Sequence, residues 1–331
     1  MRLVLVVLAA SLVSAQTPQP HIAPAGEVVG LAGVMLSVRN VDRSVPFYRD
    51  VLGLELRTSP ASFTADQQLL RLHNAAGARY RAASFALPGA PPTAALELFE
   101  YTGIDNGSTR GRIQDPGAVT LFLYVTEIAP FFERLKAAQS PIVTTSGKPV
   151  RLPEQYGAVP AVFAQDPDGF VVGIVEQPAP SSVFGFAVDD AEAALQFYID
   201  VLGFEYVGRV PFTGDAPTMD MLGTPGAQVL TIALYVPGTS YQMEIFEFKD
   251  IERRPVRTAD QLRRGALIVP GTGAPMFTVR DLTTLVPKLR RAGAAVVTAG
   301  GQTVRVGADT RAVVRDPSGV FLQLSQRRVS P

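Results

Sequence analysis

The stretch Phe47-Tyr48-Arg49-Asp50-Val51-Leu52-Gly53-Leu54-Glu55-Leu56 decides the fold, because a close copy of it returns later in the chain. The copy is Phe197-Tyr198-Ile199-Asp200-Val201-Leu202-Gly203-Phe204-Glu205-Tyr206, at an offset of 150 (197 − 47). The turn sequence Asp166-Pro167-Asp168-Gly169 is matched at the same offset by Asp316-Pro317-Ser318-Gly319. Blocks repeated in one order at one spacing indicate an internal duplication.

A third pair of segments supports the duplication. Leu96-Glu97-Leu98-Phe99-Glu100 matches Met243-Glu244-Ile245-Phe246-Glu247 at an offset of 147 (244 − 97). Each half also has the pattern of two successive units, each with a strand, a helix and three further strands. Every unit contains runs of β-branched residues, typical of strands, and one segment with apolar residues at helical spacing. We therefore predict an α+β fold of four βαβββ modules, paired two and two.

The N-terminal residues have the pattern of an export signal. Arg2 precedes the apolar run 3–13, which is too short to span a bilayer, and small residues lead to a predicted cleavage after Ala15. We expect an exported protein, periplasmic or secreted if the host is bacterial, with no membrane attachment after cleavage.

The predicted domain boundaries follow from composition. Residues 1–15 are the signal peptide, and the Pro-rich residues 16–29 are a flexible leader. The first domain is predicted over 30–177 and the second over 181–327, with residues 178–180 (Pro-Ala-Pro) as the linker.

Composition excludes several classes of function. The chain has 30 Lys and Arg against 30 Asp and Glu, with no basic run, so it lacks the positive surface of a nucleic-acid binder. It has no cysteine, which excludes disulfides, thiolate metal sites and a cysteine nucleophile. Its two histidines are His21, in the predicted leader, and His73. A metal site with several histidines from one chain is therefore not expected.

The first module shows the expected local signals. Residues 34–38 favour a strand, and Asn40 or Asp42 can cap the helix that follows. Gly53 is placed to end that helix as its C′ residue. Residues 59–79 have a weak pattern and are interpreted as a long loop over a cleft. Residues 95–101 alternate, so that Glu97 shares a strand face with the aromatic residues that follow it.

These motifs together resemble the vicinal-oxygen-chelate superfamily, which includes glyoxalase I, fosfomycin- and bleomycin-resistance proteins and extradiol dioxygenases. The resemblance rests on the Phe-Tyr-x-Asp-Val-Leu-Gly helix end, the Glu-Leu-Phe or Glu-Ile-Phe strand and the Asp-Pro-Asp-Gly turn, and it covers nearly all of residues 31–326. It implies two glyoxalase-like domains in which each pair of modules forms a curved sheet. Because this fold hosts many activities, the resemblance alone does not assign a reaction.

In metal-using members of the superfamily, each module supplies one ligand from its first strand, usually His, and one from its last strand, usually Glu. The four corresponding positions of the first half are Gly33, Glu97, about Thr120 and Gly173. Those of the second half are Val183, Glu244, about Ala274 and Gln323. Each half keeps one carboxylate and no histidine, a set that cannot hold a catalytic divalent ion well.

The residues expected to carry function are Glu97 and Glu244, each as a general base or as a ligand-binding acceptor. The alternative for Glu97 is a solvated strand residue, or one paired with Arg79 or Arg81. Thr120 and Gln323 are further ligand-binding candidates, and no metal ligand is assigned.

Several other residues receive a structural interpretation. His73 could shuttle protons, although a lone loop histidine is more commonly a surface residue. Tyr48 and Tyr198 are predicted to pack in the core. Asp166 and Asp316 are interpreted as turn residues rather than calcium ligands.

The function predicted from these residues is metal-independent binding of a small, partly apolar molecule in a sheet cradle, with no cofactor. Three alternatives stay open. One is a metal-dependent lyase, isomerase or dioxygenase, which would use Glu97 with His73, or Glu244 with Gln323. Another is a metal-free enzyme with Glu97 or Glu244 as base. The last is a scaffold protein with a filled cradle, and a homodimer is compatible with each.

Overall fold

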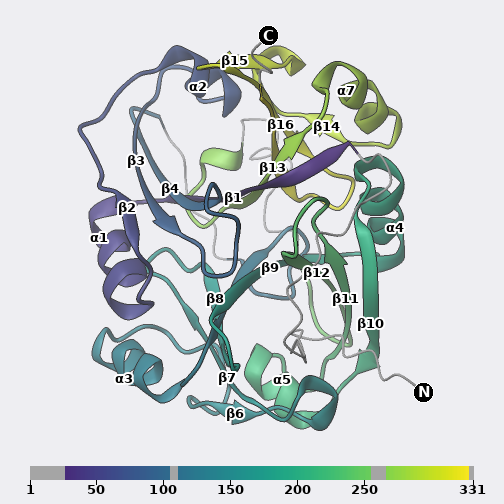
Figure 1. Ribbon diagram of the computed structural model, residues 1–331. Coiled ribbons are helices and arrows are strands. Elements are labelled where there is room, and N and C mark those ends of the chain that lie inside the picture. The colour runs from purple at the N-terminus through teal and green to yellow at the C-terminus, as the bar shows by residue number, and fades with distance from the viewer. Residues whose placement is uncertain (1–26, 105–110, 255–265, 328–331) are drawn as a thin grey trace.

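The computed structural model describes residues 27–104, 111–254 and 266–327 (Figure 1). Its strands form two curved sheets, called sheet A and sheet B. Sheet A runs β14 (Ala295–Val296), β16 (Asp309–Arg315), β17 (Phe321–Gln326), β13 (Gly273–Val279), β1 (Val28–Val38), β4 (Ala95–Thr102), β3 (Arg79–Ala86) and β2 (Leu56–Thr58), with β15 (Val304–Val306) beside β16. Sheet B runs β10 (Glu205–Thr213), β11 (Gln228–Tyr235), β12 (Gln242–Lys249), β9 (Ser181–Val188), β5 (Val119–Val125), β8 (Val171–Glu176), β7 (Pro160–Gln165) and β6 (Val150–Arg151).

Each sheet combines modules from both halves of the sequence. Sheet A joins the first module to the fourth, and sheet B joins the second to the third, through the antiparallel pairs β1–β13 and β5–β9. The predicted four modules in two curved sheets are confirmed. The expectation that the two modules of one half would share a sheet is wrong. All four modules carry the same apolar alternation, so the sequence pattern does not choose a partner for each.

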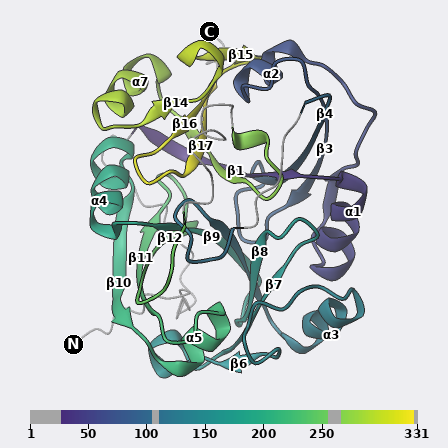
Figure 2. The same ribbon diagram turned by 180° about the vertical axis from the view of Figure 1, so that it is seen from behind.

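Helices cover the outer sides of the sheets and also enter their concave faces (Figures 1 and 2). The helical segments are α1 (Val41–Pro46), η1 (Phe47–Val51), α2 (Gln67–Leu72), α3 (Ala129–Ala137), η2 (Glu154–Tyr156), α4 (Ala191–Gln196), η3 (Phe197–Leu202), α5 (Ala216–Leu222), η4 (Ala266–Ile268), α7 (Leu282–Arg291) and η5 (Ala299–Gly301). Both views place α1 beside α3 on one side of the molecule and α4 beside α7 on the other. Among the described residues, no helix has the length and apolarity needed to cross a membrane.

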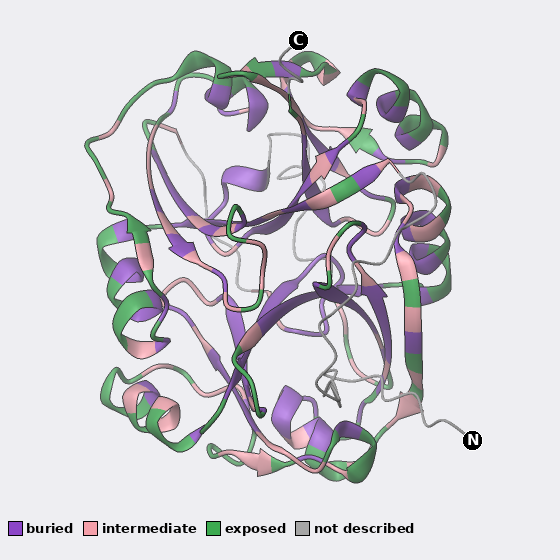
Figure 3. Ribbon diagram, in the orientation of Figure 1, coloured by how far each residue is buried: buried purple, intermediate pink, exposed green. Residues whose placement is uncertain are grey.

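One hydrophobic core lies between the convex faces of the two sheets. Phe184 of β9 and Phe277 of β13 meet there with ring centroids 6.2 Å apart. On β4, Leu96 and Leu98 face this core, whereas Glu97 and the aromatic residues after it face the opposite, concave side. The predicted alternation along this strand is therefore confirmed. Figure 3 shows the buried strands in purple and the exposed outer faces of the helices in green.

The repeated Phe-Tyr motif joins the two modules of each sequence half. In the first half Tyr48 is fully buried, and its hydroxyl donates to Asp166 Oδ2 over 2.9 Å. Tyr198 makes the same bond to Asp316, also at 2.9 Å. The predicted core role of both tyrosines is confirmed, and the turn aspartates also accept these two bonds across the module boundary.

The motif itself forms a π-helical turn in both halves, η1 and η3. Pro46 lacks the N–H that an α-helix would use, yet Gln196 occupies the matching position before the same turn in the second half. The proline is therefore not the cause of the π-turn. Gly53 ends the first turn with a positive φ of 71°, as predicted.

Some predicted boundaries differ from the structure. The leader was predicted to extend to residue 29, but β1 already begins at Val28. The loop predicted over 59–79 contains α2, capped by the side chain of Asp66. The predicted signal peptide lies outside the described residues.

Candidate functional site

Strand register identifies the positions in sheet A that correspond to metal ligands in the superfamily. Gly33 of β1 lies opposite Met276 of β13, and Met35 lies opposite Ala274. Each of Gly33 and Ala274 thus lies opposite the residue two positions after the other, so they occupy equivalent places on the two strands. This is the equivalence that the sequence comparison expected. On the next strands, Glu97 lies beside Met35, and Gln323 lies beside Met276. Sheet A thus brings Glu97 and Gln323 to one concave face, which we call cradle A.

Sheet B repeats this geometry with different residues. Val183 lies opposite Phe122, and Gly185 lies opposite Thr120. Glu244 lies beside Gly185, while Gly173 lies beside Phe122. The concave face of sheet B, called cradle B, therefore combines Glu244 with Thr120.

The crosswise pairing of the modules changes the residue sets that were predicted. Glu244 and Gln323 belong to different sheets, so they cannot form one site, and that alternative is wrong. Glu97 shares a cradle with Gln323 instead of Thr120. His73, at the C-terminal end of α2, also lies in cradle A, as the position of its loop over a cleft suggested.

Gly33, the first-strand position of the first module, cannot carry any side chain. Gly33 has a positive φ of 136°, and a Cβ built there would lie 1.9 Å from the carbonyl oxygen of Ala95. A histidine at this position would require the backbone of β1 or β4 to move. The close approach of β1 and β4 therefore prevents residue 33 from carrying a metal-ligating side chain.

A hydrogen-bonded chain of side chains crosses cradle A. The hydroxyl of Tyr101 donates to His73 Nδ1 at 2.6 Å, and His73 Nε2 donates to Gln323 Oε1 at 3.0 Å. Gln323 Nε2 then lies 3.3 Å from the sulfur of Met276. The acceptor carbonyl of Gln323 fixes the neutral Nε2–H tautomer of His73. Both ring nitrogens and the amide of Gln323 are thus engaged.

His73 is a buried residue, 1% exposed, rather than the surface histidine that its loop context suggested. Burial lowers its pKa from 6.5 to about 4 despite the hydrogen bond to Gln323, and the charge of Arg311 lowers it further. At neutral pH His73 is therefore uncharged. It holds the chain of hydrogen bonds in place and does not carry a proton between solvent and site.

Glu97 remains available to a ligand. Its side chain is half-buried, and among the described residues its carboxylate forms no hydrogen bond or ion pair. The predicted alternative, pairing with Arg79 or Arg81, is wrong. Arg81 pairs with Glu100 at 2.8 Å, and Arg79 donates to the carbonyl of Phe63.

The electrostatics of cradle A involve one cation. Burial raises the pKa of Glu97, and Arg311 of β16 partly opposes that rise. Arg311 pairs with Asp309 at 3.2 Å through Nη2, while its buried Nε has no hydrogen-bond partner. Cradle A therefore offers an accepting carboxylate, with the charge of Arg311 nearby.

Cradle B presents a carboxyl group in a closed interior. Glu244 is 0% exposed, and neither of its oxygens has a hydrogen-bond partner among the described residues. Burial raises its pKa to about 8, so the group is mostly protonated at neutral pH. The hydroxyls of Tyr124, Tyr156 and Thr218 are also buried in this interior, those of Tyr156 and Thr218 close to each other.

Aromatic rings and α5 fill the rest of cradle B. A Cβ at Gly173, the last-strand position, would lie 2.5 Å from the ring of Phe163. Phe122 and Phe246 pack against the same region, and Met221 and Leu222 of α5 close it. The cavity that remains between these groups has a volume of about 20 Å³, which holds one water molecule and no larger ligand.

The donor set does not fit a divalent metal of the superfamily type. Across residues 27–104, 111–254 and 266–327, no three His, Cys, Asp or Glu side chains come together as they would around a metal ion. In cradle A, Glu97 is the one carboxylate at the four family positions, and the lone pair of His73 accepts from Tyr101. A catalytic metal needs at least three such ligands.

Sequence reasoning missed four groups in the cradles: Arg311, Tyr124, Tyr156 and Thr218. Arg311 lies two residues before Val313 on β16, so the two side chains share the strand face that lines cradle A. Strand periodicity could therefore have identified Arg311. Tyr124 likewise lies two residues beyond Phe122 on β5. Thr218 and Tyr156 lie on a helix and a turn whose placement over cradle B has no such signal.

Comparison with known proteins agrees with this architecture. The family model for the Glyoxalase/Bleomycin resistance protein/Dioxygenase superfamily matches residues 30–174 and again 182–324. Lactoylglutathione lyase of Haemophilus influenzae is 26% identical over 154 residues, which cover 46% of this chain and 95% of that protein.

Similar solved structures share the whole fold at low identity. Glyoxalase I from Zea mays aligns with a TM-score of 0.59 and 17% identity, covering 90% of this chain and 92% of that chain. A putative dioxygenase from Bacillus subtilis aligns with a TM-score of 0.54 and 13% identity, covering 92% and 87%. With its two matches to the family model, this chain belongs to the Glyoxalase/Bleomycin resistance protein/Dioxygenase superfamily.

Proposed function

We propose that the protein binds a small, partly apolar molecule in cradle A without a metal ion. The observation that carries the proposal is the half-buried carboxylate of Glu97, which has no hydrogen-bond or ion-pair partner in the described part of the chain and lies among Met35, Phe99 and Met276. Small-molecule sites combine apolar walls with a few placed polar groups. In cradle A the polar group is the carboxylate of Glu97, with the charge of Arg311 nearby.

The cradles differ in access, and this difference favours cradle A. Ser84 lies opposite Glu97, and both are half-buried, so solvent reaches this part of the concave face. In cradle B the matching pair, Ala233 and Glu244, is fully buried. A ligand can reach Glu97 while the protein keeps its fold, whereas Glu244 is fully enclosed.

A matched pair of variants tests this proposal. We would screen small molecules by thermal shift against the wild-type chain, Glu97→Gln and Glu244→Gln. Ligands of cradle A should raise the melting temperature of wild type and Glu244→Gln, and should lose at least roughly tenfold in affinity with Glu97→Gln. Ligands that ignore Glu97→Gln would contradict the proposal.

The metal-free part needs its own measurement. The full chain, purified without chelators, should contain no stoichiometric metal, and Mn²⁺, Ni²⁺, Zn²⁺ or Fe²⁺ should not raise its melting temperature. A tightly held ion that stabilises the protein would overturn the metal-free proposal and would point to ligands outside the four family positions.

A second candidate is a metal-free enzyme with Glu97 as general base. It is favoured by the burial-raised pKa of Glu97, because a carboxylate with a raised pKa is a stronger base. For this candidate, Glu97→Gln should abolish turnover of a compound. The variant should still bind that compound through its uncharged groups. Unchanged turnover would exclude Glu97 as the base.

A further inference from the structure

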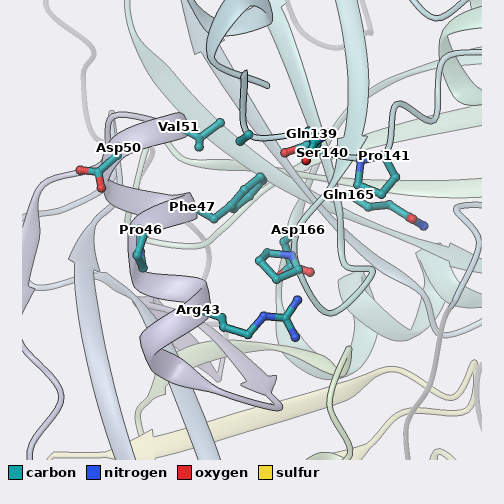
Figure 4. Close-up of a pocket in the computed structure, with 12 residues that line it drawn as sticks. Arg43, Pro46, Phe47, Asp50, Val51, Gln139, Ser140, Pro141, Gln165 and Asp166 are labelled. Carbon is teal, nitrogen blue, oxygen red and sulfur yellow. The ribbon is translucent and has the colours of Figure 1, made fainter. Parts of the chain in front are cut away.

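A cleft lies on the outer, helical side of the first half, away from both cradles. It has a volume of about 400 Å³ and is lined by Arg43, Phe47 and Val51 on one side and by Ser140, Pro141 and Pro167 on the other (Figure 4). We call it the α1–α3 cleft. Its volume lies within the range of small-molecule sites.

The walls of the cleft are mostly apolar. Phe47 is buried and points into the hollow, and prolines from two different loops face it (Figure 4). The cleft crosses the joint between the first and second modules, where Tyr48 bonds to Asp166. Its two sides are therefore held at a fixed distance by a buried contact.

Arg43 is the charged group of the cleft that remains free to contact a ligand. Among the described residues, its guanidinium has no hydrogen bond or ion pair, and Figure 4 shows it extending across the opening toward the side of Asp166. The carboxylates nearby are already engaged. Asp50 points away and pairs with Arg49 at 2.7 Å. Asp168 accepts from the backbone of Arg39 at 2.9 Å; burial raises the pKa of Asp168, and the nearby charges of Arg39 and Arg43 oppose that rise.

Asp166, at the inner end of the cleft, is also committed. Its Oδ1 accepts from the backbone N–H groups of Asp168 and Phe170, each at 2.8 Å, and its Oδ2 accepts from Tyr48. A bound anion would therefore meet the unpaired cation of Arg43 and, at Asp166, a carboxylate whose lone pairs are directed into the protein.

The duplication provides an internal comparison for the cleft. Arg43 corresponds to Ala193 (193 − 43 = 150), and the buried helix residues Leu135 and Leu289 (289 − 135 = 154) align Ser140 with Ala294. The second half thus has alanine at both polar positions. The guanidinium and the hydroxyl are not required by the joint itself, since Tyr198 makes that joint without them.

We propose that the α1–α3 cleft is a second binding site, which takes small organic carboxylates. Arg43 contacts the carboxylate, and Phe47 with the prolines contacts the apolar part. Arg matches carboxylates because its planar fork presents paired N–H donors, and Ser140 adds a hydroxyl donor. The proposal does not depend on ligand binding in cradle A.

The test uses 4-fluorophenylacetate as probe, followed by ¹⁹F NMR, with neutral 4-fluorophenylacetamide for comparison. The acid should bind the wild-type chain more tightly than the amide. Arg43→Ala, which copies the second half, should weaken binding of the acid roughly tenfold and leave the amide unchanged. Ser140→Phe should fill the cleft and remove binding of both.

Two controls make the outcome decisive. Arg71→Ala removes an exposed arginine of α2 that does not line the cleft, and it should leave binding of the acid unchanged. Glu97→Gln should also have no effect, because cradle A lies on the other face of sheet A. No binding of the acid, equal binding by Arg43→Ala, or equal losses in Arg71→Ala or Glu97→Gln would overturn the proposal.

Discussion

Cradle A and cradle B have the same strand order and the same register, yet they provide different environments for equivalent glutamates. Glu97 is half-buried beside the cation of Arg311, whereas Glu244 is fully buried without any partner. Cradle A contains a continuous chain of hydrogen bonds through His73. Cradle B contains the packed rings of Phe122, Phe163 and Phe246 and a cavity of about 20 Å³.

The comparison shows that burial, rather than the residue type at a family position, separates the two sites. An accessible carboxylate can exchange its hydration for a ligand, while an enclosed one without partners is more stable when it keeps its proton. The same duplication therefore produced one cradle with a half-buried carboxylate and one that is filled by its own side chains. Three predictions test this difference, beginning with the largest effect.

The first prediction concerns the strand position that is empty in cradle A and filled by Val183 in cradle B. Gly33→Ala should reduce the free energy of unfolding by about 4 kcal/mol, because the new Cβ would lie within 1.9 Å of the Ala95 carbonyl on a strand with positive φ. Urea denaturation of the wild-type and variant chains measures the loss.

A second glycine separates the clash from the backbone effect. Gly77 also has a positive φ, 82°, but a Cβ there would meet nothing within 4 Å. Gly77→Ala should therefore cost only about 1 kcal/mol, the usual strain of the left-handed region. If the two variants lose the same stability, steric exclusion is not what keeps residue 33 empty.

The second prediction concerns the buried proton of Glu244. Its pKa of about 8 in the folded protein lies above the ordinary value of 4.5, so the folded state binds more protons than the unfolded state between these values. Stability from this group is then complete below about pH 4.5 and falls as the pH rises, by about 3 kcal/mol at neutral pH.

Glu244→Gln should remove this dependence because the amide does not titrate. The difference in unfolding free energy between variant and wild type should increase in favour of the variant from about pH 5 to about pH 8, with about 3 kcal/mol gained at neutral pH. Asp166 and Asp316 titrate in both chains, so their contributions cancel. A constant difference across this range would show that Glu244 is ionised in the folded protein.

The sequence predicted the fold well and the sites only in part, for a physical reason. Glu97 and Glu244 were found because strand alternation and the repeat fix which face each residue occupies. The partner of each module was not predicted, since equal alternation in all four modules leaves their pairing undetermined. This is why Glu244 was placed with Gln323, which lies in the other sheet.

Burial was the other feature that the sequence could not provide. His73 was read as a loop residue because the segment around it has a weak pattern, but α2 carries it into cradle A between Tyr101 and Gln323. Its partners lie 28 and 250 residues away in the chain. Contacts at such separations depend on how the two outer modules pair, which local pattern does not specify.

The third prediction is that cradle A responds to pH in the sense opposite to cradle B. Burial lowers the pKa of His73 from 6.5 to about 4, so the unfolded state binds more protons than the folded state between these values. Stability from His73 is complete above about pH 6.5 and is lost as the pH falls toward 4, by about 3 kcal/mol when fully developed.

Two measurements test this behaviour. In a His21→Gln chain, His73 is the one histidine left, so its imidazole NMR signals should stay unchanged between about pH 8 and pH 5.5 and shift only near pH 4. His73→Gln should weaken the acid-induced loss of stability in denaturation experiments. A midpoint near 6.5 would show that His73 is solvated, and cradle A would then lack the closed chain of hydrogen bonds that distinguishes it from cradle B.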